Sequence, residues 1–425
     1  MIAYNTAIVL LGTSLLGASA GLVGSYAVLR GRSLLGDALA HAALPGLCLA
    51  FLLVGERSLP AMLAGALVSG VIGVAVITVL RRYTRIKEDA AIGIVLSVFF
   101  GAGVALSGWI QRQTTTGSKA GLDHFILGRT AGMIRQDLYL IAAVALVSLL
   151  VVLLLYKEFK LVSFDVGFAG AQGWPALKLD LLMMILLAVT VVIGLPAVGV
   201  VLMAAMLILP AAAARFWTDR LSAMLALSAL FGLVAGAVGT SISANRGNMP
   251  AGPVIVLSGT VVFLISVLFA ARRGGLARWL RRIRFRRRLA EQMLLELLYE
   301  LAEPQRQGQS FSVDDVAAAA RWDARQARRL LDSAARRGLV ETQGEGQYRL
   351  SEKGASRAAE VARGSRLWTL FLLENAQLAG AFEELDVESA DEVLPPQVIA
   401  DLEAKLQAAG RLPARWRSEP AGGTP

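Results

Sequence analysis

Two ionisable side chains, Asp37 and His41, stand four residues apart in the stretch GDALAHAALPG, residues 36–46. On an α-helix this spacing stacks them on one face, one turn apart. The other residues of the stretch are apolar, and ionisable groups in apolar runs are rare and usually functional. A carboxylate oxygen and an imidazole nitrogen together suit a divalent ion such as manganese, iron or zinc. A structural alternative stays open, in which Asp37 caps the helix start and His41 hydrogen-bonds to backbone in a core.

The composition indicates that a membrane surrounds these side chains. Hydrophobic residues make up 56% of the 425-residue chain and charged residues 17%, and the mean hydropathy is +0.59. Ordinary soluble domains are far less apolar. Cys48 is the only cysteine, which excludes an intramolecular disulfide and a Cys-x-x-Cys metal site. No basic segment precedes the first apolar run, so we expect a retained helix and not a cleaved signal peptide.

We predict an all-α polytopic membrane domain over residues 1–271, because its apolar runs approach the roughly 20 residues that span a bilayer. About nine transmembrane helices are expected, at residues 7–29, 37–54, 60–80, 90–110, 138–156, 179–195, 198–215, 221–242 and 253–271. Basic residues gather in alternate loops, which places the N-terminus outside and the C-terminus in the cytoplasm. The 111–137 loop is basic on the outer side, and part of it is expected to fold back into the protein.

The chain changes character after the last predicted span. Nine arginines crowd residues 272–288, which we interpret as a basic juxtamembrane linker at anionic lipid headgroups. Residues 289–425 hold 16 basic and 22 acidic side chains, whereas the first 288 residues hold 26 and 10. The basic excess therefore belongs to the membrane part, and it does not indicate nucleic-acid binding.

The cytoplasmic tail shows the pattern of a small folded domain. Ser312 and Asp315 mark a helix start, Gly338 ends a second helix, and Gly344 and Gly346 punctuate a hairpin. This order predicts a small α+β winged helix-turn-helix domain over residues 289–408, followed by a flexible tail over 409–425. The expected recognition helix carries Arg325, Arg328, Arg329 and Arg336. That face fits DNA or a protein partner, and the acidic balance of the domain does not favour DNA.

Several further runs accompany GDALAHAALPG: KEDAAIGIV (87–95), LDHFILGR (122–129), FDVGFAGAQG (164–173), VGVVLMAAMLILPAAAAR (198–215) and NMPAGPVIVL (248–257). With them, residues 1–271 resemble the integral-membrane permease of bacterial ABC importers for manganese, zinc and iron. The resemblance implies a place in the bacterial plasma (inner) membrane. It also implies three partners: a second permease subunit, identical or not, a cytoplasmic ATPase and an extracytoplasmic metal-binding protein.

The resemblance assigns roles to particular residues. The pore-lining Asp and His of the family fall on Asp37 and His41. Segment 164–173, with Phe164, Asp165, Ala169 and Gly173, corresponds to the part through which the ATPase acts on the permease. Asp123 and His124 are candidates for an outer-side metal contact, with a structural role in the loop as the favoured alternative.

The sequence also indicates that a partner protein supplies the ATPase activity. No G-x-x-x-x-G-K-[ST] phosphate loop occurs in the chain, so we expect ATP to be hydrolysed by a separate polypeptide. The chain itself is then a transport subunit and not an enzyme. It needs no permanently bound cofactor, since the metal is its cargo.

The tail is similar to metal-dependent repressors of the diphtheria-toxin-repressor type, through LSEKG (350–354), SRLWTLFLLE (365–374) and ADEVLPPQVIADLE (390–403). Two of that family's metal ligands fall on Ser365 and Thr369, and its later Glu-His pair falls on Asp391 and Glu392. With Glu388, these last two could hold a hard cation weakly. A tight metal-sensing site is not expected.

The sequence therefore predicts the permease subunit of an ATP-driven importer of divalent metal, with manganese or iron favoured over zinc. Its tail is expected to dimerise and to regulate transport. Two other functions stay open: a membrane-tethered, metal-responsive transcription factor, and an ATP-independent metal transporter.

Overall fold

The computed structural model describes residues 4–55, 58–113, 128, 130–245, 249–271, 273–302, 310–344, 346–375 and 394–413. The chain divides into two compact units, Met1–Trp279 and Leu280–Pro425. Within the described residues the protein is mostly helical, as predicted, with one small three-stranded sheet.

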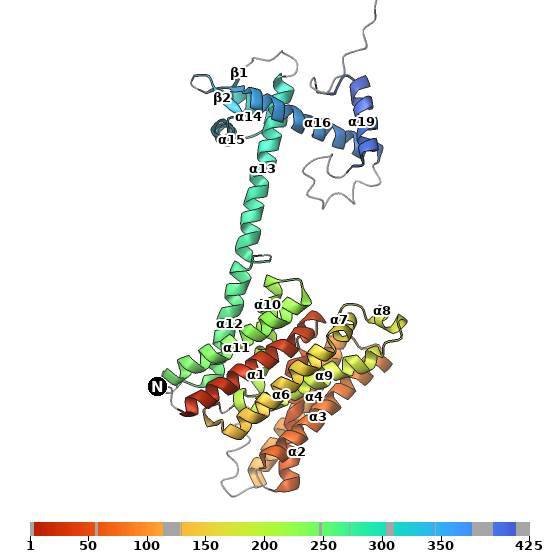
Figure 1. The fold of residues 1–425 in the computed structure, drawn as a ribbon, viewed down its shortest axis with the longest axis vertical. Coiled ribbons are helices and arrows are strands. Elements are labelled where there is room, and N and C mark those ends of the chain that lie inside the picture. The colour runs from red at the N-terminus through yellow and green to blue at the C-terminus, as the bar shows by residue number, and fades with distance from the viewer. Residues whose placement is uncertain are drawn as a thin grey trace, which may run out of the picture. The chain divides into compact units, whose positions relative to one another are not determined.

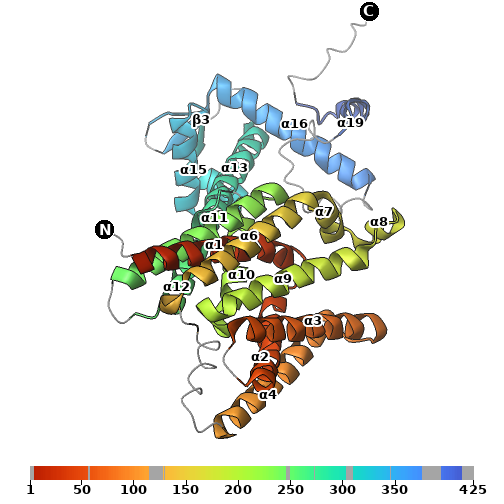
Figure 2. The ribbon, with the colours of Figure 1, turned by 60° about the horizontal axis from the view of Figure 1, so that its bottom comes forward.

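The first unit is a bundle of helices (Figure 1). Its elements in chain order are α1 (Tyr4–Leu29), α2 (Leu35–Val54), α3 (Leu59–Tyr83), α4 (Glu88–Gln113), the 3-10 turn η2 (Thr130–Gly132), α6 (Arg135–Leu154), α7 (Tyr156–Phe164), α8 (Val166–Ala171), α9 (Ala176–Val198), α10 (Val200–Trp217), α11 (Leu221–Asn245) and α12 (Ala251–Phe269). Helices α2, α3 and α4 form one group, and α1 packs against α6, α10 and α11 (Figure 2).

Eight helices in the described part of the chain are long and apolar enough to cross a membrane: α1, α2, α3, α4, α6, α9, α11 and α12. The remaining predicted span, 198–215, coincides with α10, whose apolar stretch Leu202–Trp217 is shorter. Every predicted span thus matches a helix to within three residues at either end. The prediction of a polytopic helical membrane protein is confirmed.

Part of the 111–137 loop was predicted to fold back into the protein, and the described part of this loop does so. The Thr130 hydroxyl donates to the carbonyl oxygen of Ala197 near the end of α9, at 2.7 Å, and Met133 is buried. The segment just before α6 therefore packs against the protein.

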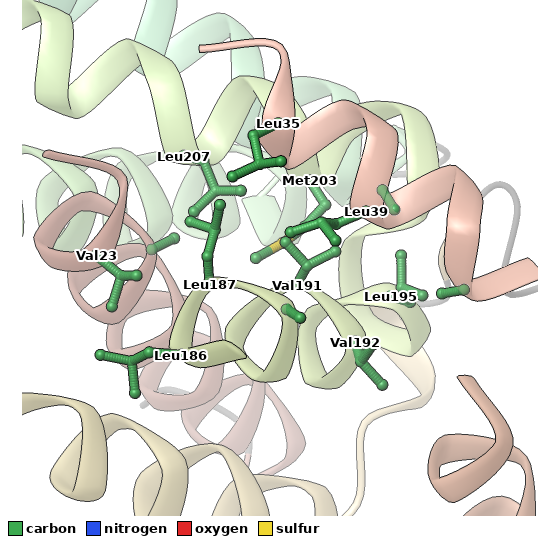
Figure 3. Close-up of a cluster of buried hydrophobic side chains, with 14 of the residues drawn as sticks. Val23, Leu35, Leu39, Leu186, Leu187, Val191, Val192, Leu195, Met203 and Leu207 are labelled. Carbon is green, nitrogen blue, oxygen red and sulfur yellow. The ribbon is translucent and has the colours of Figure 1, made fainter. Parts of the chain in front are cut away.

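An apolar core forms where α1, α2, α9 and α10 meet. Figure 3 shows Leu35 and Leu39 of α2 among Leu187 and Val191 of α9 and Leu207 of α10. Leu35, Leu39 and Val191 are almost fully buried. Because the lipid is as apolar as these side chains, close packing contacts hold membrane helices together more than exclusion from water does. This core fixes the first two turns of α2, which carry Asp37 and His41.

Small residues let α1 and α11 approach each other closely. A Cβ added to Gly232 would lie 2.0 Å from the carbonyl oxygen of Gly17, so no side chain fits there. The hydroxyl of Thr13, one turn from Gly17 on α1, shares a hydrogen bond of 2.8 Å with the hydroxyl of Thr240 on α11. Small residues and buried hydroxyl pairs are the usual means of joining helices within a membrane.

The second unit contains the C-terminal part of α13 (Gly275–Ala302) and the tail. Its other described elements are β1 (Ser310–Ser312), α14 (Val313–Ala320), α15 (Ala324–Arg336), β2 (Val340–Thr342), β3 (Gln347–Leu350), α16 (Glu352–Glu374) and α19 (Pro396–Ala408). The strands form an antiparallel sheet in the order β1-β3-β2. Helices α13, α14 and α15 share an apolar core that includes Leu294, Leu298, Val316 and Leu331.

Two sequence signals in the second unit have the structure that they predict. Ser312 caps α14, since its hydroxyl accepts from the N–H of Asp315 at 3.1 Å. Hydrogen bonds from the Ser312 hydroxyl and N–H in turn hold the pKa of the Asp315 carboxyl below its usual range. The predicted basic linker, from Gly275 onward, is the first half of α13, and this helix runs unbroken into the core of the tail.

Five charged side chains form a cluster at one end of the first unit: Arg30, Arg32, Arg81, Glu88 and Asp180. Asp180, in the first turns of α9, is only 4% exposed. Its carboxylate accepts from Arg32 at 2.6 Å, from Arg81 at 2.9 Å and from Arg30. Glu88 contacts Arg32 and lies 3.2 Å from Arg81. This ion cluster ties the α1–α2 turn to α3, α4 and α9.

Replacing Asp180 with alanine should destabilise the first unit. The change leaves Arg30 without a partner in the ion cluster and Arg32 and Arg81 with Glu88 alone, and breaking a buried ion pair in this way costs roughly 3–5 kcal/mol. Thermal unfolding of the purified protein in detergent measures the effect. Asp89→Ala is the matched control, because Asp89 is an exposed carboxylate in the first turn of α4. Equal melting temperatures for the two variants would contradict the role of the ion cluster.

Candidate functional site

Asp37 and His41 lie on the first two turns of α2, on the face that the i, i+4 spacing predicts. Asp37 Oδ1 is 3.4 Å from His41 Nε2. The His41 side chain is 14% exposed and that of Asp37 33%. The pair is thus partly shielded, with the carboxylate on its more open side.

The structural alternative was that Asp37 caps the helix and that His41 hydrogen-bonds to backbone. Neither contact is made within the described residues. The first turn of α2 has no side-chain cap, so Asp37 does not act as one. His41 Nδ1 is buried and has no hydrogen-bond partner among the described residues. The imidazole is held instead by the ring of Phe100 on α4, in an edge-on contact with centroids 4.6 Å apart.

This geometry leaves one nitrogen of His41 available as a ligand. Nε2 faces the Asp37 carboxylate at 3.4 Å and is the nitrogen that could bind a cation together with it, whereas Nδ1 is enclosed by protein. A buried polar atom without a partner costs about 1–3 kcal/mol, so the enclosed Nδ1 is a destabilising feature of this arrangement.

Pro45 changes the backbone next to this pair. Proline has no N–H, so the carbonyl oxygen of His41 lacks its usual donor four residues on. The helix nevertheless continues from Leu35 to Val54. It is supported on both sides, since the Ser69 hydroxyl of α3 donates to the Ala42 carbonyl at 2.6 Å and Gly103 of α4 lies against Pro45.

One chain offers few ligands at this place. The described residues contain no group of three or more His, Cys, Asp and Glu side chains that could hold a metal ion. Asp37 and His41 could supply two ligands, whereas a tightly held divalent ion takes four or more. The pair therefore suits a cation in passage, or a site to which a second chain contributes.

The structure places Phe164, Asp165, Ala169 and Gly173 together in the short connection of α7, α8 and the turn that follows. Asp165 Oδ1 accepts from the N–H of Phe168 at 2.8 Å and so caps α8. Ala169 is fully buried, whereas half or more of the Phe164 and Phe168 side chains is exposed. Gly173 has φ +80°, a left-handed conformation that glycine adopts easily.

This connection lies at the same end of the bundle as the ion cluster. Helix α9 begins at Ala176, directly after the turn, and Asp180 is one turn further on. A short turn therefore joins α8 to the helix that carries the central carboxylate of the ion cluster.

Asp180 was not among the functional residues predicted from the sequence. Its signal was present, since Asp180 is a single acidic residue in the apolar run ALKLDLLMM and the preceding loops supply unpaired arginines. An ionisable group in such a run calls for a partner. Which arginines would meet it depends on how four helices pack.

The remaining predicted residues divide into two sets. Arg325, Arg328, Arg329 and Arg336 all lie on α15 with exposed side chains. Five other predicted site residues lie outside the described parts of the chain, namely Asp123, His124, Glu388, Asp391 and Glu392.

Known proteins are similar to this chain over the membrane unit, and one of them over nearly the whole chain. The manganese transport system membrane protein MntC of Bacillus subtilis is 40% identical over 414 residues, which cover 97% of this chain and 94% of the relative. The zinc transport system membrane protein TroC of Treponema pallidum is 46% identical over 66% of this chain and 94% of the relative. The structure of PsaBC from Streptococcus pneumoniae in complex with Fab aligns with a TM-score of 0.57 and 34% identity, over 65% of this chain and 95% of that chain.

A family model described as the ABC 3 transport family matches residues 3–270, which include every apolar helix of the first unit. The match contains α2 with its Asp37–His41 pair, the α7–α8 connection and the ion cluster. The chain is therefore a multi-pass membrane protein that belongs to the ABC 3 transport family.

Proposed function

We propose that the protein is the permease subunit of an ATP-driven importer of divalent transition metal, with manganese as the first candidate. The observation that carries this proposal is the Asp37–His41 pair in a buried helix, with His41 Nε2 facing the Asp37 carboxylate. Membership of the ABC 3 transport family supports it. Manganese comes first because a relative named for manganese transport aligns over nearly the whole chain, and zinc stays a candidate through the relative named for zinc.

In this proposal two permease subunits form the path. Each contributes Asp37 and His41, and the two pairs together supply the four ligands that one chain lacks. The Asp37 carboxylate attracts the cation. The His41 imidazole then binds the cation and releases it further along the path. Binding has to be modest, because a site that holds its ion tightly cannot release it.

The ATPase partner binds at the α7–α8 connection. Its exposed aromatic side chains, Phe164 and Phe168, offer an apolar contact, and Asp165 holds the short helix in shape. The basic loops put this end in the cytoplasm of a bacterial cell, with the N-terminus outside. An extracytoplasmic metal-binding protein then delivers the ion at the other end.

The tail is proposed to be a winged-helix module that pairs with a second copy and regulates transport. Its order of helix, turn, helix and hairpin supports that class, and the alignment with the manganese-transport relative extends through it. A membrane-tethered transcription factor is the second candidate, favoured by the four exposed arginines of α15. The acidic balance of the tail weighs against DNA.

Asp37→Ala and His41→Ala should each lower metal uptake by at least about tenfold, since changing a ligand or its supporting partner typically costs 10–100-fold. Manganese uptake by cells that carry the variant importer measures this, with immunoblots to show equal amounts in the membrane. Asp89→Ala removes an exposed carboxylate and should transport normally. Near-normal uptake in both site variants would return the pair to structural roles.

Phe168→Asp should weaken the attachment of the ATPase, because it puts a charge on the exposed apolar face of the α7–α8 connection. Co-purification of the ATPase with tagged permease, and ATP hydrolysis by the complex in liposomes, report the loss. Tyr139→Asp is the control, since Tyr139 is also exposed but lies at the opposite end of α6. ATP hydrolysis by this chain alone would refute the division of labour.

Deleting residues 289–425 should leave metal uptake measurable while changing its response to metal supply. The first unit has its own core and its own ion cluster, so it should fold and reach the membrane without these residues. Uptake is compared at low and high external manganese in cells with the full or shortened chain. Sequence-selective DNA binding by the full-length protein at physiological salt would favour the transcription factor.

A further inference from the structure

A cavity of about 440 Å³ opens between α13 and α15 in the second unit. Its polar lining includes Arg287 and Glu291 from α13 and Arg329, Ser333, Arg336 and Arg337 from the region of α15. Small-molecule sites in proteins usually occupy roughly 300–1,000 Å³, so the cavity is large enough for a small ligand.

The carboxylates of the cavity already have partners. Glu291 forms an ion pair with Arg337, and Asp332 accepts a hydrogen bond of 2.6 Å from the Tyr348 hydroxyl. The guanidinium groups of Arg287, Arg329 and Arg336 have no such partner within the described residues. The cavity therefore presents an excess of positive charge in one concave place.

The two helices hold these groups in a fixed arrangement. Arg329, Ser333 and Arg336 follow the i, i+4, i+7 spacing of one face of α15, and Arg287 and Glu291 are one turn apart on α13. Beneath them, Leu294 and Leu298 of α13 pack in one core with Leu331 of α15. Since the backbones are set by this core, a ligand needs to order only the arginine side chains.

We propose that this cavity binds a small anion that carries phosphate. Guanidinium groups bind phosphate oxygens through two parallel hydrogen bonds, and three of them can surround one phosphate or pyrophosphate group. Leu330 and Ala334 give the cavity an apolar part, which suits a ligand with an organic body as well as a charged end. A concave site between two helices fits a small ligand better than it fits the extended backbone of duplex DNA.

The phosphate can come from a soluble molecule such as a nucleotide or from an anionic lipid headgroup. The binding chemistry is the same in both cases. Because α13 continues from the membrane unit into the core of the tail, a ligand that bridges α13 and α15 would act on the helix that joins the two units. The cavity belongs to the second unit and the proposed metal ligands belong to the first, so the ligand would serve regulation and not transport itself.

Titration calorimetry of the full-length protein in detergent, with inorganic pyrophosphate as the probe, tests the proposal. We expect saturable binding with a Kd below about 1 mM. Arg329→Gln combined with Arg336→Gln should weaken it at least about tenfold, because charge-assisted hydrogen bonds are lost. The matched control is Arg325→Gln combined with Arg328→Gln, on the same helix but outside the lining, which should bind within about twofold of the unchanged protein.

A gain-of-binding variant separates a ligand site from a merely structural cluster. Glu291→Gln removes the carboxylate that occupies Arg337, and should tighten pyrophosphate binding several-fold. Circular dichroism confirms that all variants keep their helical content. Unchanged or weaker binding by the Glu291 variant would overturn the proposal.

Nanodiscs distinguish the two sources of phosphate. Equal pyrophosphate affinity in phosphatidylcholine and phosphatidylglycerol discs supports a soluble ligand, and loss of affinity only in phosphatidylglycerol discs supports a lipid headgroup. Absence of saturable binding up to about 10 mM pyrophosphate overturns the proposal. The proposal is also overturned if duplex DNA displaces pyrophosphate and if both double arginine variants lower the affinity for DNA equally. The cavity would then be part of a surface that binds nucleic acid.

Discussion

The pairing of Asp180 with three arginines is the constraint on which the membrane unit depends. A carboxylate and guanidinium groups are costly to bury in apolar surroundings unless they neutralise one another. Here the partners come from the α1–α2 turn, α3 and α9, with Glu88 of α4 completing the set. The charges can be buried only when all these segments are in place, so the ion cluster specifies how they meet.

The position of α2 follows from this constraint. Arg32 is fixed in the ion cluster just before α2 begins, and the helix then enters the core beside α9 and α10. The Asp37–His41 pair thus starts from an anchored turn, and its imidazole is wedged against Phe100 of α4. An ion path built on such a helix has a defined position, although a single chain gives it only two side-chain ligands.

The two units of the chain are stabilised by different physics. In the first, Gly17 and Gly232 let helices touch at their backbones, and hydroxyl pairs and the ion cluster supply the polar contacts. In the second, an ordinary apolar core lies under a charged surface, and arginines remain on that surface without carboxylate partners in the described residues. The ion cluster therefore makes one end of the first unit rigid, whereas the second unit has guanidinium groups that can bind a ligand.

Hydropathy alone determined the membrane part of the fold. The apolar runs were long enough to be recognised one by one, because a bilayer requires about 20 consecutive apolar residues whatever the neighbouring helices do. The i, i+4 spacing of Asp37 and His41 likewise placed both side chains on one face, since helix geometry is local. The capping of α14 by Ser312 was readable for the same reason.

Only the tertiary structure decided which charged groups meet. Arg30, Arg81 and Asp180 are far apart in the sequence. The sequence assigned the two arginines to basic cytoplasmic loops and Asp180 to a predicted span, with nothing to pair them. Ala169 read as part of a contact segment, yet it faces inward while Phe168 faces out. Arg329 and Arg336 read as part of a recognition surface, yet they line a cavity with α13. Contacts between distant segments depend on packing, and a pattern within one helix does not contain that information.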